Sequence, residues 1–139
     1  MAILWIDFRM NRAKGYMKSN LQQPLSLGGI ADEMGLSVSR FSHLFKSHTG
    51  LAPKQWLKRE RLQKAARLLV MNPDLSIKEI AGEVCFNSSR LSREFRKEFG
   101  VRPSDYRERA QGISDLNADS AASQERELVW PGSSVGQAG

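Results

Sequence analysis

Apolar residues recur at helical spacing along the first 110 positions, and no stretch alternates between apolar and polar residues as a strand would. The pattern predicts a first helix over residues 7–19, a short second helix through Met34, and a third helix through about His48. Ser26 and Ser37 stand where the N-caps of the second and third helices are expected.

A long helix is predicted over residues 53–71, because Pro53 suits a first helical position and an apolar stripe follows it. That stripe has i, i+3, i+4, i+7 spacing and consists of Leu62, Ala65, Ala66 and Leu69. Ser76 then opens a short helix, which is followed by a turn near Cys85, a helix to Phe99 and a last helix starting in "GVRPSDY". The expected fold is all-α, with about seven helices.

One segment of the chain occurs twice. Residues 30–45 read "IADEMGLSVSRFSHLF", and fifty positions later residues 80–95 read "IAGEVCFNSSRLSREF". Residues 25–59 align with residues 75–109 without a gap, and twelve of the 35 aligned positions are identical. Such agreement indicates an internal duplication. Each copy is a short helix, a tight turn and a second helix, which is the pattern of a helix-turn-helix.

The second helix of each copy has one apolar side and one polar side on a helical wheel. We expect burial of Phe41, Leu44, Phe45 and His48 in the first copy and of Leu91 and Phe95 in the second. The outer faces carry Ser39, Ser42, His43, Lys46 and Ser47, and Ser89, Ser92, Arg93, Arg96 and Lys97. One such face could be an ordinary solvated surface. Two acid-free faces of the same layout favour reading of a DNA major groove, where Arg pairs with guanine and cations neutralise phosphates.

The charge of the chain fits a polyanionic partner. The net charge is +6 and the sequence pI is about 9.8. Residues 1–110 hold 20 Lys and Arg against 11 Asp and Glu, whereas residues 111–139 hold one Arg against four acids. The second stretch is rich in Gly, Ser, Ala and Gln, and it is predicted to be a disordered tail.

These patterns divide the chain into two helix-turn-helix subdomains joined by a long central helix. The expected segments are an N-terminal helix of the first subdomain (1–24), the first helix-turn-helix (25–52), the linker helix (53–72), the second helix-turn-helix with the final helix (73–110) and the tail (111–139). The linker helix would be roughly 28 Å long at 1.5 Å per residue. Successive major grooves on one face of DNA lie about 34 Å apart, so one monomer could place both copies on the same duplex.

Other classes of protein find little support. The single cysteine, Cys85, excludes an internal disulfide, and we expect it to be a small buried hydrophobe. His43 and His48 are five apart and do not form an i, i+4 metal pair, so no metal, cofactor or enzymatic activity is predicted. No apolar stretch reaches the roughly 20 residues of a membrane span, and a cytoplasmic location is expected.

The segments "PLSLGGIADEMGLSVSRFSHLFKSHTGLAPKQWLKRERLQKAARLL" and "LSIKEIAGEVCFNSSRLSREFRKEFGVRPSDYR" resemble the DNA-binding domain of the AraC/XylS family of bacterial transcription regulators. The resemblance covers about residues 7–109. It implies two helix-turn-helix units joined by a long helix, promoter binding and contact with RNA polymerase. We expect an activator that binds DNA as a monomer, with repression left open by the sequence. By position the resemblance assigns base contacts to Ser39, Ser42, His43, Ser89, Ser92 and Arg93. The candidate phosphate contacts are Arg40, Lys46, Lys58, Arg61, Arg90, Arg96 and Lys97.

The second copy departs from the family pattern in three ways. It is one residue shorter before Phe95, which predicts an altered entry angle for its recognition helix. Cys85 stands where a glycine is common, and Glu94 stands where the first copy has Leu44, so the Glu94 carboxylate must reach solvent or a basic neighbour.

Two alternatives stay open at this point. The chain could be a protein-binding module that contacts RNA polymerase or another regulator without reading DNA. Because residues 1–6 are too few for another domain, the chain is expected to be either a stand-alone regulator or the isolated DNA-binding part of a larger one.

Overall fold

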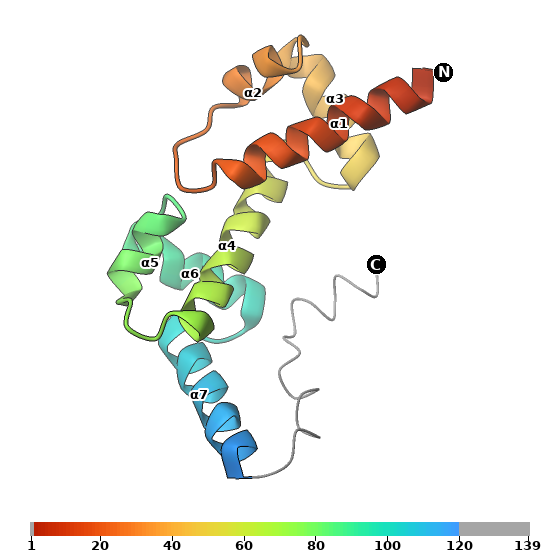
Figure 1. The fold of residues 1–139 in the computed structure, drawn as a ribbon. Coiled ribbons are helices and arrows are strands. Elements are labelled where there is room, and N and C mark those ends of the chain that lie inside the picture. Colours follow the sequence, from red (N-terminus) through yellow and green to blue (C-terminus); the bar gives the residue numbers. More distant parts are fainter. Residues whose placement is uncertain (1, 120–139) are drawn as a thin grey trace. The chain divides into compact units, whose positions relative to one another are not determined.

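The computed structural model describes the backbone of residues 2–119 and the side chains of residues 4–112. Within this range the fold is built of seven helices and contains no strand, which confirms the predicted class (Figure 1). The helices are α1 (Ala2–Ser19), α2 (Leu27–Glu33), α3 (Val38–Thr49), α4 (Pro53–Met71), α5 (Ile77–Glu83), α6 (Ser88–Phe99) and α7 (Pro103–Asp119). They form two compact units that divide between Arg61 and Leu62, and α4 contributes to both.

Polar side chains start the short helices at the positions that the sequence indicates. The Ser26 hydroxyl accepts a hydrogen bond from the backbone N–H of Gly29 (3.0 Å) at the start of α2. The Ser37 hydroxyl accepts one from the N–H of Arg40 (3.2 Å) at the start of α3. These bonds satisfy N–H groups that have no partner inside the helix.

The second unit begins with a stronger cap. The Ser76 hydroxyl accepts from the Glu79 backbone N–H (3.1 Å), and the Glu79 carboxylate accepts from the Ser76 N–H (3.0 Å). This reciprocal capping box starts α5. The hydrogen bond from the Ser76 backbone, followed by that from its side chain, lowers the pKa of Glu79 below its ordinary value. The first unit has Gly29 at the matching position and cannot form the same box.

The two ends of the chain's helical part differ from the prediction. Helix α1 begins at Ala2 instead of Asp7, because residues 2–6 contain no proline or glycine to stop it. Helix α7 continues to Asp119, nine residues past the predicted end of the last segment, with Gly112 accommodated inside it. The expected boundary at Gln111 is therefore wrong for the backbone. The remainder of the predicted tail, residues 120–139, lies outside the described residues.

Each unit encloses its own hydrophobic core. The buried core residues of the first unit are Met10, Ala13, Met17, Leu21, Ile30, Ala31, Met34, Phe41, Phe45, Trp56 and Leu57. Those of the second unit are Leu62, Ala65, Ala66, Leu69, Ile80, Ala81, Val84, Phe86, Leu91, Phe95, Phe99 and Tyr106. The predicted stripe of α4 thus lies in the second core.

One aromatic contact repeats in both cores. Phe45 of α3 meets Trp56 of α4 edge to face, with ring centroids 5.5 Å apart and an interplanar angle of 81°. Fifty positions later, Phe95 of α6 meets Tyr106 of α7 at 5.2 Å and 83°. Edge-to-face pairs of this kind add to the free energy gained by burial, and burial raises the pKa of the Tyr106 hydroxyl. This contact holds the second helix of each copy against the helix that follows it.

Candidate nucleic-acid interface

Helix α3 separates a buried face from a polar face as the sequence predicts. Phe41 and Phe45 have no solvent exposure, while Leu44 and His48 are half-buried. The His48 imidazole lies 3.2 Å from the carboxylate of Asp7 on α1, so a polar contact fixes this less buried end. The polar face presents the exposed residues Ser39, Arg40, His43, Lys46 and Ser47, with Ser42 half-buried at its edge.

Helix α6 presents the matching face of the second unit. Leu91 and Phe95 are fully buried, and Phe99 is buried beside them. A broad open depression of about 860 Å³ lies over the opposite side of the helix. It is lined by Ser88, Ser89, Ser92, Arg93, Arg96, Lys97 and Arg102. Three hydroxyls and four cationic side chains therefore share one concave surface without an acidic residue among its lining.

Most of the predicted contact residues occupy these two faces. The base-contact candidates Ser39, Ser42 and His43 lie together on α3, and Ser89, Ser92 and Arg93 lie together on α6. The phosphate-contact candidates on these two helices are all exposed, namely Arg40, Lys46, Arg90, Arg96 and Lys97. Lys58, on α4, is half-buried. The placement satisfies the geometric requirement that these side chains be accessible on a helix face.

Arg61 is not available for a phosphate, which corrects the sequence-based assignment. Its side chain is only 8% exposed. The guanidinium donates hydrogen bonds to the carbonyl oxygens of Leu21 (3.1 Å) and Gln23 (2.7 Å), after the end of α1. A buried cation with such partners stabilises the fold of the first unit. An arginine on an amphipathic helix gives no sequence signal of whether its head reaches water or a distant carbonyl.

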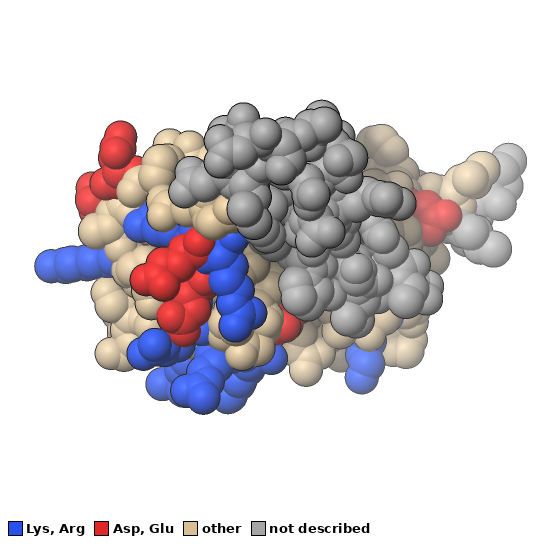
Figure 2. Space-filling view, turned by 90° about the horizontal axis from the view of Figure 1, so that it is seen from below, with Lys and Arg blue, Asp and Glu red and all other residues tan. Residues whose placement is uncertain are grey.

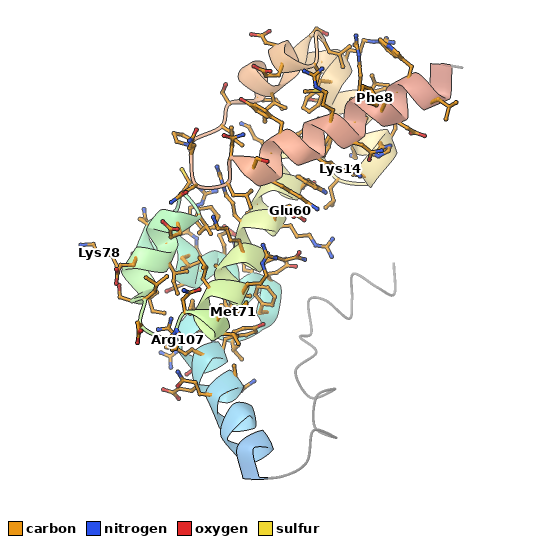
Figure 3. All side chains as sticks on the ribbon, in the orientation of Figure 1. Phe8, Lys14, Glu60, Met71, Lys78 and Arg107 are labelled. Carbon is orange, nitrogen blue, oxygen red and sulfur yellow. The ribbon has the colours of Figure 1, made fainter. Side chains whose placement is uncertain are left out.

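Arg107 makes the corresponding kind of contact in the second unit. From α7, where Figure 3 labels it, its guanidinium donates to the carbonyl oxygens of Leu69 (3.1 Å) and Asn72 (3.3 Å) at the end of α4. Arg102 is the one cation in the lining of the depression over α6 that the sequence did not predict. It directly precedes Pro103, the first residue of α7, and makes an ion pair with Asp105 (3.1 Å).

The turn of the second copy contains an unusual backbone. Gly35 of the first copy has a φ of 69°, as its position after α2 predicts, and the equivalent Cys85 has a φ of 62°. Cys85 is the only non-glycine residue with a positive φ in the described chain. It is half-buried, so the expectation that it is a buried hydrophobe is met only in part. The φ demanded by the turn outweighs the preference of the thiol for a core.

The remaining departures of the second copy leave its helices in register with the first. Helices α5 and α6 start and end fifty positions after α2 and α3. The altered entry angle that the family pattern implies for α6 stays a prediction. Glu94 is half-buried where the first copy has the half-buried Leu44.

Positive charge is not spread evenly over the surface of the molecule. Figure 2 shows cationic side chains gathered at the lower edge of the drawn face, with acidic side chains close beside them. The net charge of +6 alone therefore does not mark an interface. The lining on α6, in which no described residue is acidic, makes that helix face the stronger candidate. Among the described residues, no group of three or more potential metal ligands gathers, and no helix is long and apolar enough to span a bilayer.

Comparison with known proteins identifies the class. Residues 30–109 match the family model described as a helix-turn-helix domain. A helix-turn-helix-type transcriptional regulator of Bacillus subtilis, YfiF, is 35% identical over 70% of this chain and 31% of its own length. The transcriptional activator RhaS of Escherichia fergusonii is 36% identical over 73% of this chain and 37% of its own length. The chain thus spans about a third of the length of the curated relatives it matches.

Solved structures agree with this result. An AraC-type regulator from Chromobacterium violaceum has a TM-score of 0.71 and 28% identity, over 75% of this chain and 93% of that one. The DNA-binding domain of AdpA, solved with a target DNA, has a TM-score of 0.68 and 28% identity, over 81% of this chain and 96% of that one. The chain belongs to the helix-turn-helix family of AraC-type regulators. This membership favours the DNA-binding interpretation over a protein-binding module.

Proposed function

We propose that the chain is the DNA-binding part of a transcription regulator and reads double-stranded DNA with α3 and α6. The observation that carries the proposal is the depression over α6, whose described lining combines three serines with four cations, one of which, Arg102, is paired with Asp105. Cations of this kind neutralise phosphates, and Arg and Ser can reach base edges in a major groove. The AdpA domain of the same fold was solved with its target DNA, which supports the same surface use here.

Within this proposal, each of the two helix faces contacts both the base edges and the phosphate backbone of the DNA. Ser39, Ser42 and His43 of α3, and Ser89, Ser92 and Arg93 of α6, contact base edges. The exposed cations Arg40, Lys46, Arg90, Arg96 and Lys97 contact phosphates. Half-buried Lys58 is a further candidate for the backbone, whereas Arg61 is withdrawn because its guanidinium is bonded inside the first unit.

The salt dependence of binding tests the electrostatic part of the proposal. For a duplex that contains a site selected from a random pool, log affinity should fall linearly with log salt, by about 0.9 per phosphate contact. Lys46→Ala and Arg96→Ala should each lower the slope by about 0.9, because each removes one exposed cation. A nearly flat salt dependence of the unsubstituted chain would contradict DNA binding.

We further propose that one monomer places its two recognition helices in successive major grooves. Helix α4 runs from Pro53 to Met71, as the sequence predicts for the linker, and the spacing of helix-turn-helix half-sites is 10–10.5 base pairs. Inserting about five base pairs between the half-sites turns one groove to the far side of the duplex. The affinity should drop towards that of a single half-site, and the nuclease footprint should shorten to one groove. Unchanged affinity and footprint would mean that only one unit reads DNA.

The biological role that fits best is transcription activation in the bacterial cytoplasm, with no catalytic step by this chain. RhaS relatives are named transcriptional activators, which supports activation over repression. RNA polymerase is the expected protein partner, because activators act on it at promoters. In a transcription assay with purified polymerase, the chain should raise initiation from a promoter that carries the selected site. A fall in initiation would indicate repression instead.

A further inference from the structure

The second unit contains an arginine held against an aromatic ring at the start of its recognition helix. The guanidinium carbon of Arg90 lies 4.4 Å from the centroid of the Phe86 ring. Phe86 is 8% exposed and belongs to the core of its unit, so the ring is a fixed support. The Arg90 backbone is fixed as well, because its N–H donates to the side-chain oxygen of the N-cap Asn87 at 2.7 Å. Both ends of this exposed cation are therefore constrained.

The first unit has the same backbone arrangement without the ring. Its matching residues, fifty positions earlier, are Leu36 and Arg40. The N–H of Arg40 donates to the Ser37 hydroxyl at 3.2 Å, so the helix is capped in the same way. Leu36 also packs partly buried against its core. A leucine side chain has no π face for a cation, so Arg40 lacks the aromatic support of Arg90. The residue four positions further along the helix also differs, being Leu44 in the first unit and Glu94 in the second.

Arg90 lies on one edge of the polar face of α6. Residues at i, i+3 and i+7 share one side of a helix, which places Arg90, Arg93 and Lys97 along this edge, all exposed. The corresponding edge of α3 carries Arg40, His43 and Ser47. An anion that approaches α6 from this side thus meets three cationic side chains, of which the first is already held in place, and the half-buried Glu94 among them.

We propose that Phe86 is a positioning residue that pre-orders Arg90 for a DNA phosphate, and that the second unit is therefore the stronger anchor of the chain on DNA. The inference rests on the proposed function. A free arginine loses side-chain entropy when it binds, and an arginine stacked on a ring has lost part of it beforehand. The second unit accordingly grips the backbone more tightly than the first, although their helices have the same lengths.

Glu94 offers a rival way to hold Arg90. It stands four residues further along α6 and is half-buried, and oppositely charged side chains at i, i+4 attract each other. If Glu94 ordered the guanidinium, Glu94→Gln would weaken DNA binding and Phe86→Leu would not. The proposal requires that Phe86→Leu weakens DNA binding. Glu94→Gln should leave binding unchanged or strengthen it, because it removes a negative charge near the phosphate.

The experiment measures affinity for the selected duplex over a range of salt concentrations. Phe86→Leu gives the second unit the residue that the first unit has at this place, and it should weaken binding about 2–5-fold, the equivalent of one exposed cation–π contact. Because Arg90 keeps its charge, the salt slope should stay the same. Arg90→Ala should lower the slope by about 0.9 and should cost more affinity than Arg40→Ala.

Three further variants separate positioning from a structural role. Phe86→Tyr keeps the ring and should restore the affinity that Phe86→Leu loses. Arg90→Lys leaves the core untouched and keeps the charge, yet it should lose about 2–5-fold because an ammonium lacks the planar stack. Leu36→Phe should strengthen binding by a similar factor, because it introduces the support into the first unit.

The double variant decides the result. In the Arg90→Ala background, Phe86→Leu should have no further effect on affinity. If it still weakens binding 2–5-fold, or if Leu36→Phe brings no gain, the positioning proposal is overturned while DNA binding by the chain stands. If the unsubstituted chain shows no salt-dependent binding to any duplex, the proposed function fails instead. Circular dichroism of each variant verifies that its helices are intact.

Discussion

The first and second helix-turn-helix units of this protein have separate but similar cores, and their surfaces differ in part. Ile30 and Ala31 of the first have the same identity and the same burial as Ile80 and Ala81 of the second, with exposures of 2% or less. Some outward positions have changed, as His43 in one unit against Arg93 in the other illustrates, whereas Ser39, Arg40 and Ser42 recur as Ser89, Arg90 and Ser92. Packing tolerates little change of volume, whereas an exposed helix face can alter its chemistry freely. A duplicated fold can therefore acquire two different DNA-contacting faces.

The largest expected effect is the loss of stability when a buried aromatic ring is removed. It tests whether the two cores stabilise their units equally. Phe45 and Phe95 are both fully buried and make the same edge-to-face contact. Phe45→Ala and Phe95→Ala should each destabilise their own unit by about 3–5 kcal/mol. Urea denaturation followed by circular dichroism measures the losses. If the two losses differ by more than about 2 kcal/mol, a scale set by the spread of such substitutions, the cores are not equivalent.

Arg61→Ala should be the next largest change. It removes the buried guanidinium that bonds to the carbonyls of Leu21 and Gln23, and it should cost about 1.5–3 kcal/mol of the free energy of unfolding. Arg107→Ala is the matched control and should cost less, because Arg107 is half-buried. Where the variant is folded, the salt slope of DNA binding should not change. A slope lowered by about 0.9 would return Arg61 to the phosphate contacts.

The two recognition faces should differ in what they discriminate. Arg93→Ala should cost about 1–3 kcal/mol on the selected site and relax preference at one base pair, because a bidentate contact to guanine is lost. Arg96→Ala should weaken binding to all sequences about equally. His43→Ala, the first-unit match of Arg93, should relax preference at a different base pair. Selection from random duplexes with each variant reads this out, and identical profiles for Arg93→Ala and Arg96→Ala would contradict their assigned roles.

A smaller effect concerns the turn. Cys85→Gly should stabilise the second unit by about 0.5–1 kcal/mol, because glycine adopts a positive φ without strain but adds freedom to the unfolded chain. Gly35→Ala should destabilise the first unit by about 1 kcal/mol for the same backbone reason. The new Cβ would otherwise have ordinary room, 4.0 Å from the Arg9 guanidinium. Cys85→Ala serves as the control, and its thermal midpoint should stay near that of the parent chain.

The smallest effect concerns the capping box, which only the second unit has. Because the folded-state pKa of Glu79 is lowered by the hydrogen bonds from Ser76, its contribution to stability is present above the ordinary pKa. That contribution is lost as the pH falls through the lowered pKa. The stability difference between the parent chain and Glu79→Ala should therefore be constant near neutral pH and shrink in acid. A difference that grows in acid would contradict the capping box.

The sequence by itself determined the all-α class, the duplication, the bounds of the inner helices and the polar faces of α3 and α6. These features follow from local rules, since apolar spacing, N-caps and glycine turns act within a few residues of one another. Those rules did not predict where α1 begins or where α7 ends. Nothing in residues 2–6 or 111–119 is strongly amphipathic, although both stretches are helical.

The tertiary structure alone decided how particular long side chains are used. Arg61, Arg90 and Arg107 all read as exposed cations on helices. Packing buries the first against carbonyls some 40 positions earlier in the chain, stacks the second on a core ring, and bonds the third to the end of α4. An arginine has a long flexible stem, and its periodicity fixes only the face from which it starts. The destination of its guanidinium depends on which carbonyl, ring or solvent the rest of the fold brings within reach.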